Sequence, residues 1–188
     1  MFENQDPASI KKAIALAAVS GMRCTLGPAI LAAEKGDSSK GMMAAAALGE
    51  FVVDKIPFIP SRASLPLLLP RAVAGGYVAR RILGHSEPWG AVLGAVVAAG
   101  VATLAPRVRR LIGSALGVPD AFVGLAEDYL ALKIGANAVG MEPGELYHAS
   151  GLGELLGMAA SHGEGHVPQA DDAFHRPPVG ASSTPIGY

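Results

Sequence analysis

The sequence predicts an all-α, polytopic membrane protein with about five hydrophobic helices, some of them short or broken, followed by a polar C-terminal tail. Of its 188 residues, 51% are hydrophobic and 16% are charged, whereas soluble proteins carry roughly 25% charged residues. The mean hydropathy is +0.37 although the tail is polar. Aromatic residues make up only 5%, so small residues supply much of the apolar surface, as in closely packed membrane helices. We divide the chain into a helical membrane domain, residues 1–140, and a tail, residues 141–188.

Charge and cysteine content exclude several classes of function. The net charge of −1 argues against a nucleic-acid partner. The single cysteine, Cys24, allows neither an intrachain disulfide nor a cysteine-rich metal site. The chain has no hydrolase elbow, phosphate loop or helical pair of metal ligands, so an enzyme is the least favoured class and we expect no cofactor. The first apolar run, which follows Lys11 and Lys12, is predicted to be a retained helix rather than a signal peptide.

The first predicted helix covers about residues 9–33 and is unusual at its centre. Arg23 lies there, flanked by Gly21, Gly27 and Pro28. A proline inside a helix removes a backbone donor and clashes with the preceding turn. Two interpretations follow: a simple kink with Arg23 neutralised by one partner, which we favour, or a break like those of the discontinuous helices of transporters.

Charges in two further helices predict a buried cluster with Arg23. The second helix, about residues 41–56, carries Glu50 and Asp54 on one face, and the fifth, about residues 120–140, carries adjacent carboxylates. Lipid tolerates such charges poorly, so they need partners. Adjacent helical residues point about 100° apart, so at most one of the two carboxylates of the fifth helix faces the cluster squarely. The predicted cluster is Arg23, Glu50, Asp54, Glu127 and Asp128, with Lys55 and Lys133 as supporting charges.

The third and fourth helices carry the packing signals. The third begins at about residue 66 or 70, with Arg71 at its opening, and ends near residue 83. The fourth covers about residues 89–105, and a short helix over residues 110–116 follows the break at Pro106. Its residues Gly90, Gly94 and Ala98 recur every four positions and predict close helix contact. Arginines flank both ends of this helix, so the orientation in the membrane stays open even though Lys11 and Lys12 favour a cytoplasmic amino terminus.

The tail predicts an amphipathic surface helix over about residues 142–160, and then disorder. His162, His166 and His175, with Asp171 and Asp172, are weak candidates for a divalent metal. We favour a solvated tail that holds no metal and offers a binding segment to a soluble partner.

Three segments together resemble an uncharacterised bacterial family of small integral membrane proteins, known only as a domain of unknown function. Residues 20–23 with Pro28 resemble its first-helix Gly-Leu/Met-Arg motif, residues 50–57 its Glu-Phe-x-x-Asp-Lys-x-Pro signature, and residues 125–132 its Glu-Asp helix. The resemblance covers roughly residues 10 to 140, and the second motif is the most specific. It implies a multi-pass protein of the bacterial inner membrane and suggests no activity.

Two classes of function stay open. The first is a proton, cation or small-solute transporter or channel-like protein, since the predicted cluster has more carboxylates than arginines and the surplus calls for a proton, a cation or water. The second is a structural or scaffolding membrane protein, in which the charges fix helix register and small-residue faces form a homo-oligomer in the lipid bilayer.

Overall fold

The computed structural model describes residues 6–53, 65–84 and 88–163, and these residues form helices with no strand among them. The predicted all-α class is therefore confirmed. The helices are α1 (Pro7–Met22), α2 (Leu26–Lys35), α3 (Lys40–Val53), α4 (Leu65–Leu83), α5 (Pro88–Leu116), α6 (Asp120–Ala138), α7 (Pro143–Ala149) and α8 (Leu152–Gly163).

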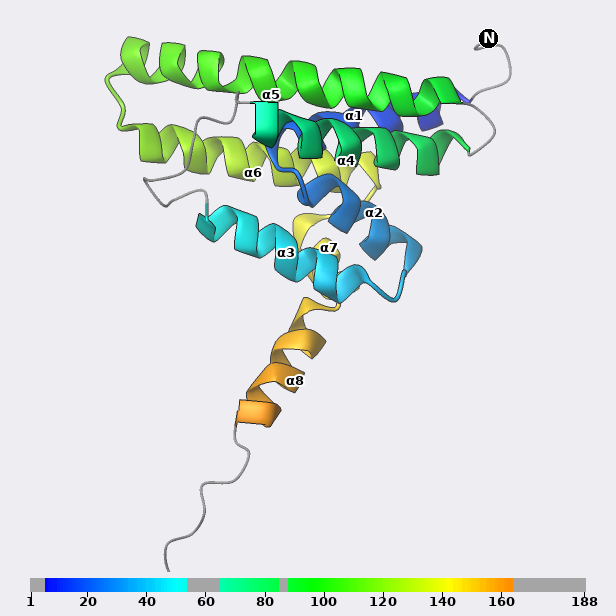
Figure 1. Cartoon of the computed structure of the whole chain (residues 1–188). Coiled ribbons are helices and arrows are strands. Elements are labelled where there is room, and N and C mark those ends of the chain that lie inside the picture. Colours follow the sequence, from blue (N-terminus) through cyan, green and yellow to red (C-terminus); the bar gives the residue numbers. More distant parts are fainter. Residues whose placement is uncertain (1–5, 54–64, 85–87, 164–188) are drawn as a thin grey trace, which may run out of the picture.

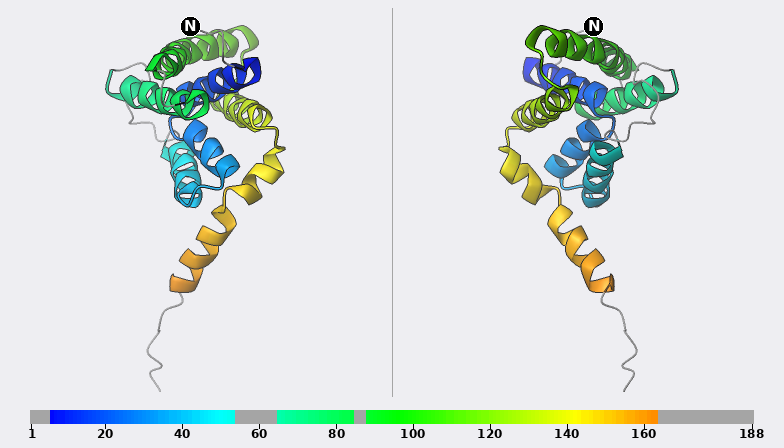
Figure 2. Two further views of the ribbon diagram at one scale, coloured as in Figure 1. Left: turned by 90° about the vertical axis from the view of Figure 1, so that its right-hand side faces the viewer. Right: turned by 90° about the vertical axis from the view of Figure 1, so that its left-hand side faces the viewer.

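The helices form two layers and a projecting arm (Figure 1). In one layer α1 packs against α4, α5 and α6, and α4 lies along α5. In the other layer α2 packs against α3. The short α7 contacts α2 and α6, and α8 extends away from the body, as both side views in Figure 2 show.

The first predicted helix is broken rather than kinked, so the favoured interpretation is wrong. α1 ends at Met22, α2 begins at Leu26, and the chain folds back so that Lys12 pairs with Glu34. Pro28 falls in the first turn of α2, where its missing N–H is not needed. A Cβ added to Gly27 would lie 2.0 Å from Ser20 Oγ, so glycine permits the tight crossing of the two helices.

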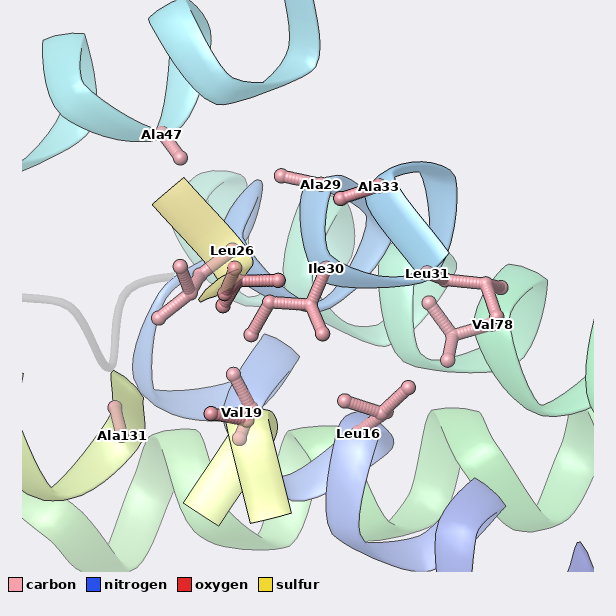
Figure 3. Close-up of a cluster of buried hydrophobic side chains, with 12 residues drawn as sticks. Leu16, Val19, Leu26, Ala29, Ile30, Leu31, Ala33, Ala47, Val78 and Ala131 are labelled. Atoms are coloured by element: carbon pink, nitrogen blue, oxygen red, sulfur yellow. The ribbon is translucent and has the colours of Figure 1, made fainter. Parts of the chain in front are cut away.

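The hydrophobic core is centred on α2 (Figure 3). Ile30 and Leu31 are almost fully buried. In the close-up, Leu31 lies beside Val78 of α4, and Ile30 lies toward Val19 of α1. Leu146 of α7 belongs to the same core, so residues just beyond the predicted boundary at residue 140 pack against the helical body.

The small residues of α5 face α4 and α1 inside the chain. Gly90, Gly94 and Ala98 are buried. A Cβ on Gly94 would lie 2.2 Å from the carbonyl oxygen of Gly75 in α4, and a Cβ on Gly21 would lie 2.5 Å from that of Ala98. This face is therefore covered within one chain and does not offer the oligomer contact that the sequence suggested.

Helix boundaries also differ from the prediction in α5 and in the tail. α5 continues through Pro106 to Leu116, whereas the sequence predicted an end at residue 105 and a new helix from residue 110. A proline costs one backbone hydrogen bond, and the remaining turns on both sides keep their bonds. The predicted surface helix of the tail is two helices, α7 and α8, separated at Gly151, whose φ of 67° lies in the left-handed region.

One helix among the described residues, α5, is long and apolar enough to cross a membrane. Only 17% of its most apolar 18-residue window is buried inside the protein. By length and composition the other described helices do not qualify, so the set of about five spanning helices stays a prediction.

Candidate functional site

A buried ion pair lies at the turn between α1 and α2. Arg23 directly follows the last residue of α1 and is 1% exposed. Its Nε donates to Asp128 Oδ1 of α6 at 2.8 Å, and a terminal guanidinium N–H contacts the same oxygen. The guanidinium carbon lies 5.0 Å from the centre of the Phe51 ring, within the range of a cation–π contact. Arg23 therefore joins α1, α3 and α6 through one side chain.

Glu50 of α3 caps the start of α2 from outside that helix. Its carboxylate accepts hydrogen bonds from the backbone N–H of Cys24 at 2.8 Å, the backbone N–H of Thr25 at 2.9 Å and the Thr25 hydroxyl at 2.8 Å. Thr25 is the N-cap residue but makes no capping bond with its own side chain. A carboxylate at a helix N-terminus satisfies free N–H groups and interacts favourably with the helix dipole.

Arg71 of α4 is the site residue that sequence reasoning missed. Its side chain is almost fully buried, and a terminal nitrogen lies 3.5 Å from Glu50 Oε1. The sequence left the start of this helix open between residues 66 and 70 and placed Arg71 at its opening, which Pro70 favoured. α4 begins at Leu65, so Arg71 lies inside an apolar helix. A charge in an apolar helix needs a partner, and this feature of the sequence could have identified Arg71 as a site residue.

The two adjacent carboxylates of α6 have different partners. Asp128 meets Arg23, whereas Glu127 Oε2 lies 3.7 Å from Arg109 of α5. Arg109 also bonds Asp120, with Nε 2.7 Å from Oδ1. Glu127 therefore contributes to a second charged group, with Arg109 and Asp120, at the α5–α6 end of the molecule.

The remaining predicted residues either lie outside the described residues, in whole or in part, or are exposed. Asp54 and Lys55 lie outside the described residues, as do His166 and His175, and only the backbone of His162 is placed, in α8. Lys133 is exposed on α6 and does not support the cluster. Within the described ranges, no group of three or more His, Cys, Asp or Glu residues is arranged to hold a metal ion.

The cluster lies at one depth in the helical body. Charged residues also meet at the other end of the helical body. There Lys12 pairs with Glu34, Arg81 pairs with Asp37, and Lys35 donates a hydrogen bond to the carbonyl of Arg81. We call this the amino end. At 1.5 Å per residue, the cluster residues lie about 15 to 18 Å along their helices from it. Each distance is counted from a residue at the amino end to the cluster residue of the same helix. The four pairs are Lys12 and Arg23, Lys40 and Glu50, Leu83 and Arg71, and Ala138 and Asp128.

Comparisons of the chain with family models, with curated proteins and with solved structures found no match. The resemblance drawn from the three motifs therefore stays a prediction.

Each described arginine of the cluster has a carboxylate partner: Arg23 is paired with Asp128 and Arg71 with Glu50. Glu127, which the sequence counted as surplus, lies beside Arg109. The predicted surplus of carboxylates stays a prediction, because Asp54 and Lys55 lie outside the described residues. Chemically, the arrangement is suited to hold a chain reversal in place between four helices.

Proposed function

We propose that the chain is a multi-pass protein of the bacterial inner membrane with a structural or scaffolding role, in which the central charges hold a re-entrant helical hairpin. The hairpin is α1–α2, which starts and finishes at the amino end. The observation that carries the proposal is the pairing of Arg23, fully enclosed at the turn of the hairpin, with Asp128.

Exposed apolar side chains support the membrane location. Large hydrophobic residues lie more than half exposed along the outer faces of three helices: Leu69 and Val73 on α4, Val92, Val96, Leu104 and Leu111 on α5, and Phe122 and Leu125 on α6. Soluble monomers rarely expose apolar patches of this extent. In a lipid bilayer these side chains are not exposed to water, so the free-energy cost of that exposure is absent, because lipid tails are as apolar as the side chains.

The depth of the charges agrees with this location. The cluster lies about 15 to 18 Å from the amino end, which is close to half of a ~30 Å hydrocarbon core. The 29 residues of α5 extend about 43 Å at 1.5 Å per residue, which is enough to cross that core and place Arg109 and Arg110 beyond it, with Arg107 at its edge. The motif resemblance to a family of bacterial membrane proteins points the same way.

In a scaffolding role, the outer surfaces of the protein bind partners, and the charged cluster only stabilises the fold. The small-residue face of α5 is covered by α4 and α1, so a homo-oligomer needs another contact. The outer face of α4 carries Leu69, Val73 and Tyr77 at four-residue spacing, all exposed, and is the face we assign to it. The tail beyond α8 is the segment that we assign to a soluble partner.

A second candidate, transport of protons, cations or small solutes, is favoured by one specific observation. The backbone N–H groups at the break between α1 and α2 are held by a single carboxylate, Glu50, from a neighbouring helix. Loss of this contact, as in Glu50→Gln, would weaken the cap and free the turn of the hairpin to move.

Flux in proteoliposomes separates the two candidates. The purified protein and its Glu50→Gln variant are reconstituted, and proton and cation fluxes are compared with those of empty vesicles. Under the scaffolding proposal wild type adds no flux. Flux from wild type that is lost in a normally folded Glu50→Gln variant would favour transport. Flux that is equal in both proteins would count against a role of Glu50 in it.

A further inference from the structure

An apolar groove of about 510 Å³ lies between α5 and α6. α1 packs on α5 and α6 only as far as its last turn, and Met22 forms the inner limit of the groove. From there the groove follows one face of α5, including Leu104 and Val108, to the α5–α6 turn, where Val118 and Phe122 line it. Small-molecule sites typically have volumes of about 300 to 1,000 Å³ and are mostly apolar with a few polar groups.

Arg109 and Glu127 are the two charged residues that line this groove. The Arg109 guanidinium binds the Asp120 carboxylate side-on, with Nε 2.7 Å from Oδ1 and a terminal nitrogen 2.5 Å from Oδ2. The Asp120 side chain is 73% exposed, so another anion can reach its place. A guanidinium binds carboxylate and phosphate in the same two-pronged way.

Two further features at this end of the groove favour an anion. α6 begins at Asp120, and its N-cap residue, Pro119, makes no side-chain capping bond. The N-terminus of a helix attracts negative charge through its dipole and its free N–H groups. Arg107 and Arg110 lie exposed on the neighbouring turn of α5 and bond only carbonyls of their own helix in the contacts seen, Thr103 and Pro106.

We infer that the α5–α6 groove binds an anionic phospholipid, with an acyl chain along the groove and the phosphate on Arg109 in place of Asp120. The inference rests on the proposed membrane location, because the exposed Leu111 and Leu125 directly precede the groove residues Ile112 and Ala126 on the same two helices. Lipid is the occupant that such a surface meets, and the apolar lining accepts its chain.

The test measures which lipid stays bound. Protein is purified in micelles with equal amounts of dioleoyl phosphatidylglycerol and dioleoyl phosphatidylcholine, and native mass spectrometry records the lipid retained. We expect about fivefold more phosphatidylglycerol, which corresponds to roughly 1 kcal/mol. Equal retention of the two lipids would overturn the inference. Displacement of the lipid by millimolar glycerol 1-phosphate would also overturn it, because the site would then take a free phosphate ester.

Variants test the two halves of the site separately. Val108→Trp fills the groove and should reduce retention about fivefold, whereas Val96→Trp, exposed on α5 but not part of the groove lining, should leave it unchanged. Asp120→Asn removes the competing carboxylate and should raise retention of phosphatidylglycerol about threefold, a gain that misfolding cannot produce. Lower retention in Asp120→Asn, or full retention in Val108→Trp, would contradict the inference.

The outcome is separable from the proposed function. A protein that stays in the membrane fraction but retains no preferred lipid overturns this inference alone. A protein recovered in the soluble fraction removes the proposed location and the lipid site together.

Discussion

Arg23 shows how one buried charge organises its surroundings. Its guanidinium touches Asp128 of α6 and the Phe51 ring of α3, while its own backbone ends α1. A buried ion pair gains little over a well-packed apolar pair, because desolvation offsets the attraction. Removal of one partner is different, because it leaves an uncompensated charge inside the protein.

A double-mutant cycle measures this asymmetry. We expect Arg23→Met and Asp128→Leu each to lower the free energy of unfolding by about 3 to 5 kcal/mol, and the double variant to recover most of that loss. The measurement is reversible unfolding in detergent. The matched control is Arg81→Met, which breaks the partly exposed pair with Asp37 and should cost about 1 kcal/mol or less. Additive losses at Arg23 and Asp128 would contradict the structural role of the pair.

At the residue scale, part of the site could be predicted from the sequence. Charges inside apolar helices are conspicuous, which marked Arg23, Glu50 and Asp128 as candidates, and the fold brings these three residues together around one turn. Two features could not be predicted. Pro70 made Arg71 look like a helix opening, and the partner of Glu127 depended on where the far end of α5 lies relative to α6.

At the scale of elements, contact between α4 and α5 depends on glycine at Gly75 and Gly94. A Cβ at Gly94 would lie 2.2 Å from a backbone oxygen and 2.5 Å from the Ala79 Cβ, neither of which can move aside alone. Gly100 lies on the same helix with nothing within 4 Å of an added Cβ. Substitutions at Gly94 and Gly100 therefore separate the effect of packing from that of helix propensity.

We expect Gly94→Ala to destabilise the protein by several kcal/mol, because α4 and α5 must move apart. Gly100→Ala should be neutral or stabilise it by up to about 1 kcal/mol, since alanine favours a helix over glycine. Thermal unfolding of both variants in the same detergent gives the comparison. Equal stability of the two variants would show that the close approach of α4 to α5 does not matter.

The predictability of the helices followed the strength of their end signals. α6 was predicted within a residue or two, since Pro119 and Asp120 mark its start clearly. Prolines were the source of error elsewhere. Pro28 allowed either a kink or a new helix, and Pro106 looked like an end although α5 continues for ten residues beyond it. In both cases neighbouring helices, which no local pattern reveals, decided the outcome.

At the scale of the whole molecule, the basic residues that the structure describes are unevenly distributed between its ends. The amino end carries Lys11, Lys12, Lys35, Lys40, Arg80 and Arg81, whereas the far end, at the α5–α6 turn, has Arg107, Arg109 and Arg110 among the described residues. Lysine and arginine concentrate on the cytoplasmic side of membrane proteins. In the proposed membrane arrangement the amino end therefore faces the cytoplasm.

Cysteine accessibility tests this orientation. Since Cys24 is the single cysteine, Cys24→Ser provides a background for new ones. We expect a membrane-impermeant maleimide to label Ser114→Cys, near the end of α5, in intact cells. Ser38→Cys, in the α2–α3 turn, should react only after lysis, although both positions are exposed. The reverse pattern would invert the orientation, and labelling of both positions in intact cells would contradict the membrane arrangement.

In the proposed membrane arrangement, the reversal at Arg23 also decides whether the chain crosses the membrane an even or an odd number of times. An unbroken first helix within five crossings would leave the two termini in different compartments. With the reversal, α1–α2, α3–α4 and α5–α6 form three successive excursions that each leave from and return to the amino end (Figure 1). The number of membrane crossings is then even, whether or not the shorter helices reach the far side of the membrane. Reporter domains fused to Met1 and to Tyr188 should then give the same compartment, and an added residue or two in any hairpin would not alter that result.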